Sequence, residues 1–111
     1  MSDHKVSEVV ITAADPDWLA GFVRRLISDR LCSAGHITPI RSLYRWRGQL
    51  HDTTEVKATL HTRASLVPAI IQRTRQEHPY EVPCVVATPI ADANPDYIDW
   101  IISETASDDL G

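Results

Sequence analysis

The sequence is poor in the residues from which many small catalytic and nucleotide-binding sites are built. Its 111 residues include only four glycines and two cysteines: Gly21, Gly35, Gly48 and Gly111, and Cys32 and Cys84. Glycines so far apart cannot form a phosphate-binding loop or a dinucleotide-binding fingerprint. No GxSxG elbow and no CxxC or HxxxH spacing occurs either. We therefore expect no enzyme, with a Cys84–His78 nucleophile–base pair as the least favoured alternative.

Positive charge and long apolar runs are also scarce. Lys and Arg number 11 against 15 Asp and Glu, which gives a net charge of -4 and argues against a nucleic-acid partner. No stretch approaches the roughly 18 apolar residues of a membrane span, and the polar start Met1–Lys5 is not that of a signal peptide. We expect a cytoplasmic protein with reduced thiols; a Cys32–Cys84 disulfide is the less favoured alternative.

The chain is long enough for one domain with its own hydrophobic core. Apolar residues make up 43% of it, an ordinary value for a globular protein. We expect a single domain over residues 1–111, with an ordered core at about residues 6–105. The polar head Met1–Lys5 and the small, acidic tail Ser107–Gly111 are expected to be flexible.

The first third of the chain predicts a strand followed by an amphipathic helix. Val6–Ala14 contains a β-branched run that is typical of a strand covered on both faces. Asp15 and Pro16 then favour a helix start, because the carboxylate can accept from free backbone N–H groups and proline suits the first helical position. The apolar face of the helix follows at three- and four-residue spacing: Trp18, Leu19, Phe22, Val23, Leu26, Ile27 and Leu31.

The middle of the chain predicts a long β-hairpin. Its first strand covers residues 37–46, and its connection lies near Gly48–Asp52. In the second strand, one face is apolar and the other polar: Val56, Ala58 and Leu60, then Glu55, Lys57, Thr59 and His61. Strands this long in a small domain overhang their own sheet and need a partner chain to cover them.

The last part of the chain predicts a helix, an edge strand and a short closing helix. Ser65 is a candidate cap, and Pro68 fits the first helical turn. The helix should stop before Pro79, since the residue before a proline avoids helical dihedrals. Residues 82–90 form a valine-rich strand with a proline near each end, which is typical of an edge strand or an interrupted one. Asn94 and Pro95 then repeat the cap-and-proline device.

This order of elements predicts an α+β fold of the ferredoxin-like class. The pattern is β-α-β-β-α-β, an antiparallel sandwich with an additional C-terminal helix and a long β-hairpin. The helices would cover one face of the sheet and leave the other bare. Self-association is the simplest way to bury that bare face.

Four segments together resemble the CutA family of divalent-cation tolerance proteins. They are Ser42–Gly48 (SLYRWRG), His78–Pro83 (HPYEVP), Ala87–Ile90 (ATPI) and Asn94–Trp100 (NPDYIDW), within a match that spans about Val9 to Ser103. The resemblance implies a ferredoxin-like subunit, a tight homotrimer and a link to divalent-metal tolerance, copper especially. It also implies a likeness to PII signalling proteins, so the alternative is a sensor that binds a small anionic ligand in intersubunit clefts.

The resemblance also implies candidate metal ligands for copper or another divalent cation. Of the cysteine–histidine set proposed in the family, His78 is retained, and Cys32 stands two residues from the usual cysteine position, which is Ala34 here. The residues themselves favour other roles: a free cysteine is usually a small buried hydrophobe, and a histidine at a helix end interacts with the last carbonyls. A third possibility is one histidine from each subunit on a threefold axis.

Two further sets of residues are predicted for the contacts between subunits. A polar intersubunit cleft would contain Lys57, His78, Tyr80 and Glu81. The interface itself would contain Tyr44, Trp46, Pro79, Pro83 and Trp100, since Trp and Tyr bury much area at low entropic cost. Arg41, Arg45 and Arg47 are interpreted as charge on an exposed hairpin rather than as an anion-binding patch.

Overall fold

The structure of the protein is a computed structural model, which describes residues 6–107. Residues 1–5 and 108–111 lie outside the described part, and with them most of the two termini predicted to be flexible. Four strands, three α-helices and one short 3-10 turn follow one another along the chain: β1 (Val6–Ala13), α1 (Pro16–Ser28), β2 (Ala34–Trp46), β3 (Gln49–Arg63), η1 (Ala64–Leu66), α2 (Val67–Glu77), β4 (Val85–Pro89) and α3 (Pro95–Glu104).

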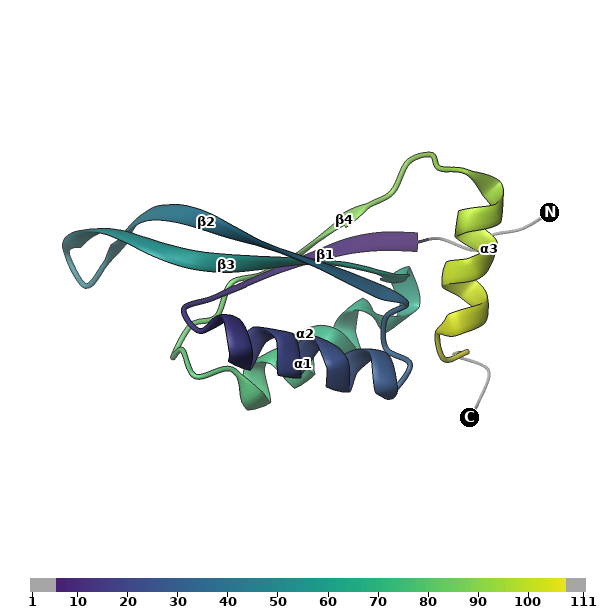
Figure 1. Ribbon diagram of the computed structural model, residues 1–111, viewed down its shortest axis with the longest axis horizontal. Coiled ribbons are helices and arrows are strands. Elements are labelled where there is room, and N and C mark those ends of the chain that lie inside the picture. Colours follow the sequence, from purple (N-terminus) through teal and green to yellow (C-terminus); the bar gives the residue numbers. More distant parts are fainter. Residues whose placement is uncertain (1–5, 108–111) are drawn as a thin grey trace.

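The strands form one antiparallel sheet in the order β2-β3-β1-β4. Helices α1 and α2 lie side by side under one face of this sheet, and α3 stands across one end of it (Figure 1). The predicted ferredoxin-like β-α-β-β-α-β fold with an additional C-terminal helix is therefore confirmed. Strand β4 lies at an edge, as predicted, but it is shorter than residues 82–90, because its pairing with β1 ends at Val85 and Pro83 has no N–H to donate.

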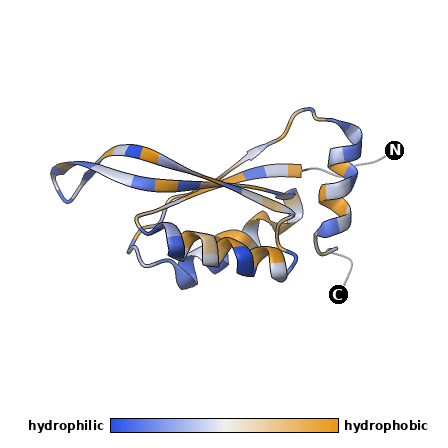
Figure 2. Ribbon diagram, viewed as in Figure 1, coloured by the Kyte–Doolittle hydropathy of each residue, from blue (hydrophilic) through white to orange (hydrophobic). Residues whose placement is uncertain are grey.

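The core lies between the sheet and the two helices beneath it. The apolar alternation predicted for β3 is confirmed, since Val56, Ala58 and Leu60 are all buried against the helices. Figure 2 shows apolar residues on the helix surfaces that face the sheet. The stripe predicted for α1 is buried at four positions, namely Leu19, Phe22, Val23 and Leu26. The prediction is wrong for Ile27. Its side chain lies at the margin of the contact between α1 and the sheet and is 40% exposed.

The contact between α1 and β2 depends on a residue without a side chain. A Cβ added to Gly35 would lie 2.5 Å from Val23 Cγ1 and 3.1 Å from Leu60 Cδ2. We expect Gly35→Ala to lower the free energy of unfolding by about 1–3 kcal/mol, the usual cost of an overpacked core. Urea unfolding measures this.

Gly21→Ala is the matched control for this substitution. Gly21 lies in α1, and its added Cβ would meet only the guanidinium end of Arg25, at 3.6 Å. Because alanine favours a helix over glycine, Gly21→Ala should stabilise by roughly 0.5–1 kcal/mol. Equal unfolding midpoints for wild type and Gly35→Ala would contradict the close packing of β2 on α1.

The ends of α1 are fixed by local hydrogen bonds. The predicted cap is confirmed: Asp15 Oδ1 accepts from the backbone N–H groups of Asp17 at 2.9 Å and Trp18 at 3.3 Å. At the other end Arg30 has a positive φ of 61°, and its N–H donates to the Ile27 carbonyl. This left-handed residue ends the helix and turns the chain toward β2.

Helix α2 starts differently from the prediction. Ser65 lies inside the 3-10 turn η1 and does not cap α2, whose first residue Val67 follows Leu66 without a side-chain cap. Ser65 cannot cap because a capping residue needs an extended backbone, which here belongs to Arg63. The other two predictions for this helix are confirmed, because Pro68 lies in its first turn and the last helical residue is Glu77, before Pro79.

The hairpin of β2 and β3 is longer and tighter than predicted. Its turn is Arg47-Gly48, with φ of 51° and 79°, and not the broader Gly48–Asp52 connection. Two residues with positive φ form the turn that matches the twist of the flanking strands. Residues 40–55 extend beyond the last pair between β1 and β3, and we call this overhanging part the arm.

Helix α3 covers one end of the sheet face that α1 and α2 leave open. Tyr97 packs edge-on against His61 of β3, and Arg63 donates to the Ile102 carbonyl and to Thr105 Oγ1. Arg30 Nη2 also donates to the carbonyl of Ser103. Two arginines thus satisfy carbonyls at the C-terminus of α3. Because α3 covers this end of the sheet, the prediction of a wholly bare sheet face is wrong here.

Candidate functional site

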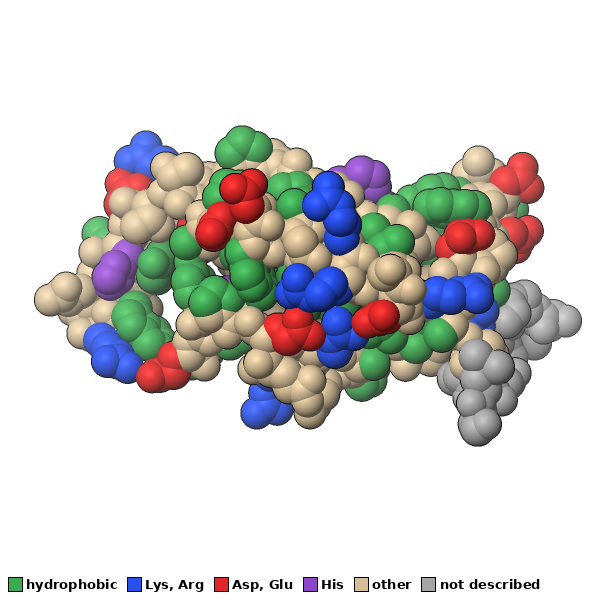
Figure 3. Space-filling model, turned by 60° about the horizontal axis from the view of Figure 1, so that its bottom comes forward, with side chains coloured by type: hydrophobic (Ala, Val, Ile, Leu, Met, Phe, Trp, Pro, Cys, Tyr) green, Lys and Arg blue, Asp and Glu red, His purple; other side chains and the backbone are tan. Residues whose placement is uncertain are grey.

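A cavity lies between the arm and the loop that joins α2 to β4. Its volume is about 760 Å³. Figure 3 shows an opening at the arm end of the molecule with hydrophobic side chains around it. The arm contributes Tyr44, Trp46 and Glu55, and the loop contributes Tyr80, Glu81, Val82 and Cys84.

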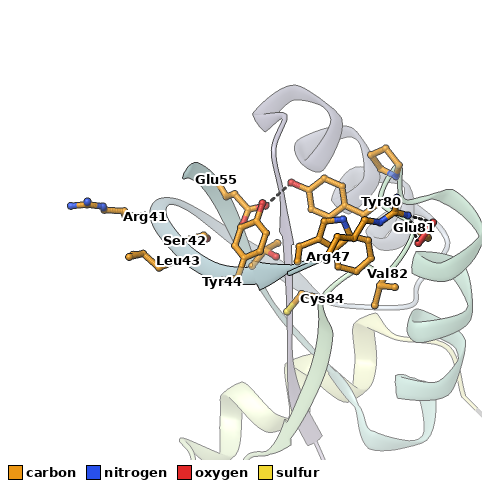
Figure 4. Close-up of a pocket in the computed structure, with 13 residues that line it drawn as sticks. Arg41, Ser42, Leu43, Tyr44, Arg47, Glu55, Tyr80, Glu81, Val82 and Cys84 are labelled. Carbon is orange, nitrogen blue, oxygen red and sulfur yellow. Dashed lines mark hydrogen bonds and ion pairs between the residues drawn. The ribbon is translucent and has the colours of Figure 1, made fainter. Parts of the chain in front are cut away.

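A chain of hydrogen bonds holds this loop against the sheet. His78, which follows the last residue of α2, is buried, and its Nε2 donates to the Thr12 carbonyl of β1 at 2.8 Å. Its Nδ1 accepts from the Tyr80 backbone N–H at 3.0 Å. The Tyr80 hydroxyl in turn donates to Glu55 Oε2 of β3 at 2.5 Å (Figure 4). One buried histidine therefore fixes the direction in which Tyr80 enters the cavity.

Glu55 is the buried acid of the site. It is 6% exposed although the alternation of β3 predicted it on the polar face with Lys57. Burial raises the pKa of Tyr80 strongly, and the hydrogen bond to Glu55 adds to the rise. The phenol therefore keeps its proton and acts only as a donor to the Glu55 carboxylate.

The charges at the rim of the cavity are paired. Arg41 makes two hydrogen bonds to Asp52, at 2.9 and 2.7 Å, and this contact lowers the pKa of the Asp52 carboxyl. Arg47, in the turn, bonds both carboxylate oxygens of Glu81 across the cavity, at 3.0 and 3.1 Å. Both pairs are largely exposed, so they contribute little to stability, but they leave neither arginine free for an anion.

The predicted polar cleft is only half assembled by the subunit. Tyr80 and Glu81 line the cavity. His78 lies beneath the loop with both ring nitrogens bonded, and Lys57 does not reach the lining. Sequence reasoning missed Glu55, because strand alternation assigns a face but does not show that a tyrosine from a distant loop covers it.

The structure does not bring the two candidate metal ligands, His78 and Cys32, together. His78 has no free nitrogen, and Cys32 is fully buried in the core, where desolvation raises the pKa of its thiol to about 12. The two also lie at different ends of the sheet: Thr12, bonded by His78, pairs with Lys57, whereas Ser33, next to Cys32, bonds His61. Positions 57 and 61 of β3 are roughly 13 Å apart at about 3.3 Å per residue.

The described histidines differ in whether a ring nitrogen is open to a metal. His61 is bonded on both sides, by Tyr97 Oη at 2.7 Å and Glu8 Oε2 at 2.9 Å. His36 and His51 make ring contacts, but no hydrogen bond to a ring nitrogen of either occurs within residues 6–107. The same residues contain no group of three or more His, Cys, Asp or Glu side chains that could hold a metal ion. Both thiols are free, with Cys84 exposed.

The predicted interface residues lie at the surface of the subunit. Tyr44 and Trp46 of the arm are 40% and 38% exposed, and Trp100 of α3 is 42% exposed. Pro79 is exposed and Pro83 half-buried in the loop beside the cavity. Of the described helices, none has the length and apolar content needed to cross a membrane.

A protein-family match covers the sheet, the arm and the loop segment HPYEVP. The family model described as CutA1 divalent ion tolerance protein matches residues 7–104. This chain belongs to the CutA1 family. The match covers all three helices and, apart from its first residue, the whole sheet, so it includes both the cavity and the arm.

Several CutA proteins are similar to this chain in sequence and structure. Divalent-cation tolerance protein CutA of Pyrococcus horikoshii is 32% identical over 99 residues, which cover 87% of this chain and 97% of that protein. A crystal structure of CutA1 from that organism has a TM-score of 0.87 at 31% identity, covering 91% of this chain and 99% of that one. The mouse Protein CutA is 34% identical over 92% of this chain but 58% of its own length.

One solved structure bears on location. It is described as the periplasmic divalent cation tolerance protein CutA from Archaeoglobus fulgidus, and it has a TM-score of 0.87 at 26% identity. The likeness covers 89% of this chain and 97% of that chain.

Proposed function

We propose that this CutA protein works as a homotrimer in the tolerance of divalent cations, copper in particular. The observation that carries the proposal is the match of the CutA1 divalent ion tolerance family to residues 7–104. By tolerance we mean that the protein binds the cation. The proposal includes no catalysed reaction. It also includes a cytoplasmic location, where free thiols such as those of Cys32 and Cys84 stay reduced. A similar protein is described as periplasmic.

The uncovered surface of the subunit supports self-association. Strands β2 and β4 are both sheet edges, and β2 presents a long row of backbone groups without a strand on its outer side. Large apolar side chains lie exposed on the arm, in the loop and on β4: Leu43, Tyr44, Trp46, Leu50, Val82 and Val86. Exposed apolar surface on an open edge is typical of a subunit that is covered by its neighbours.

A cation site in this protein would have to combine ligands from more than one subunit. No suitable group exists within residues 6–107 of one chain, and copper is bound by at least two imidazole or thiolate groups. His36 on the open sheet face and His51 on the arm are the described histidines with open ring nitrogens. One such histidine from each of three subunits would supply a trigonal set on the threefold axis.

Titration of the assembled protein with Cu²⁺ tests this proposal. Light scattering first establishes the mass of three 12.4 kDa subunits, about 37 kDa, and calorimetry then measures copper binding. We expect saturable uptake of about one ion per trimer, with at least roughly tenfold weaker binding in His36→Ala or in His51→Ala. His78→Ala is the matched control and should bind as wild type does, at a temperature where it is folded. Unchanged affinity in both variants, or a single subunit in solution, would contradict the proposal.

The alternative of a PII-like sensor for a small anion has weaker geometric support. Its best cations at the cavity would be Arg41 and Arg47, and each is already paired with a carboxylate. The same calorimetric experiment with ATP and phosphate tests this alternative. Binding of either anion without copper binding would favour it over metal tolerance.

A further inference from the structure

The cavity between the arm and the loop contains a buried carboxylate without a cationic partner. Glu55 is 6% exposed and accepts one hydrogen bond, from the Tyr80 hydroxyl. The ion pairs of residues 6–107 include no Lys or Arg bound to Glu55. Removing a carboxylate from water costs free energy unless a positive charge compensates it. A cation that binds in this cavity therefore gains more electrostatic free energy than it would beside an exposed acid.

The other charges around the cavity do not supply this compensation. Arg41 is held by Asp52 and Arg47 by Glu81, so the two pairs are close to neutral. Lys57 is the nearest cation along β3, two residues from Glu55, but it is outside the cavity lining and forms no described ion pair. The floor of the cavity thus presents one net negative charge.

The walls around Glu55 are aromatic. Figure 4 shows the Tyr80 hydroxyl directed toward the Glu55 carboxylate, and the ring of Tyr44 among the same lining residues. Trp46 completes the wall, and the guanidinium carbon of Arg47 lies 5.2 Å from its ring centroid. Aromatic faces attract positive charge through their quadrupole, most strongly where water is excluded. A carboxylate between aromatic rings is the arrangement that recognises an organic ammonium group.

The size and ligand content of the cavity argue for an organic cation rather than a metal. The volume of about 760 Å³ lies within the range of small-molecule pockets, roughly 300–1,000 Å³. A divalent metal would need several ligating side chains, and no such group occurs within the described residues. We propose that this cavity binds a small organic cation, a protonated amine carried on an aromatic or apolar body. The ammonium group pairs with Glu55, and the body lies against Tyr44 and Trp46.

Three probes of similar size and different charge test the proposal on the assembled protein. Benzylamine is positive at neutral pH, benzyl alcohol is neutral and benzoate is negative. Calorimetry at low ionic strength should show saturable binding of benzylamine, at least about tenfold tighter than binding of the other two. The experiment contains no divalent metal, so its outcome is independent of copper binding.

Two variants of the same chemical type locate the binding group. Glu55→Gln keeps the shape but removes the charge, and should weaken benzylamine binding at least about tenfold. Glu104→Gln is the control, because Glu104 is exposed at the end of α3 and lies outside the cavity lining, and it should change binding by less than about twofold. If Glu55→Gln lowers the unfolding midpoint, Tyr44→Leu replaces it, with binding about threefold weaker and the mass checked by light scattering.

Three outcomes would overturn the proposal. The first is benzyl alcohol or benzoate binding as tightly as benzylamine, and the second is Glu55→Gln binding benzylamine as wild type does. The third is no benzylamine binding in wild type, which can be accompanied by a lower oligomer mass in Glu55→Gln. That last result would assign the missing cation to a Lys or Arg of a neighbouring subunit.

Discussion

Replacing Trp46 with alanine is expected to dissociate the proposed homotrimer at concentrations where the wild type is fully assembled. Trp46 lies at the end of the arm, beyond the sheet of its own subunit, and is 38% exposed. Buried tryptophans at interfaces typically contribute 2 kcal/mol or more each. A closed trimer has three such contacts, so the loss is about 6 kcal/mol, or roughly 10⁴-fold in the assembly constant.

Light scattering of a dilution series from micromolar to nanomolar concentration measures this effect. Ile27→Ala is the control, because Ile27 is 40% exposed, almost as much as Trp46, but lies on α1 in the helical layer. That variant should keep the wild-type mass throughout the series. A Trp46→Ala protein that stayed fully trimeric below micromolar concentration would show that the arm is not part of the interface.

Replacing His78 with alanine is expected to destabilise the fold by about 2–4 kcal/mol without removing the copper binding that we propose. The substitution leaves the Thr12 carbonyl and the Tyr80 N–H without their partners at a buried position. It also removes the ring that packs edge-on against Trp18, with centroids 4.9 Å apart. Unsatisfied buried groups cost about 1–3 kcal/mol each, and the lost packing adds to this.

Urea unfolding at one fixed protein concentration measures the loss. Arg24→Ala is the control, since Arg24 is exposed on α1 and should change the free energy of unfolding by less than about 0.5 kcal/mol. Wild-type stability in His78→Ala, combined with lost copper binding, would restore His78 as a metal ligand and refute the structural role assigned to it.

The elements that the sequence predicted well are those determined by neighbours in the chain. Asp15 and Pro16 start α1, Asn94 and Pro95 start α3, and the capping bonds form within three residues. Burial of Val56, Ala58 and Leu60 follows from the two-residue period of a strand. The cap predicted at Ser65 does not form. Ser65 lies inside a 3-10 turn, where it lacks the extended backbone that a capping residue needs.

The candidate site was predictable only in part, because its residues come from distant parts of the chain. The segment HPYEVP indicated Tyr80 and Glu81, and both line the cavity. Glu55 could not be identified, since its burial depends on Tyr80, which is 25 residues away. The resemblance implied His78 as a metal ligand, while its place at a helix end favoured a structural role, and its hydrogen bonds with Thr12 and Tyr80 use both ring nitrogens.

The sequence by itself determined the order of the elements, the α+β class, the edge position of β4 and the long hairpin. Each of these follows from local periodicity, capping or proline chemistry, which act over a few residues. Only the tertiary structure decided which polar groups are satisfied and which are not. The contact between β1, β3 and the loop after α2 is what leaves His78 fully bonded. The same contact buries Glu55 without a cation. Hydrogen bonding and desolvation depend on which groups are close in space and not on their distance along the chain.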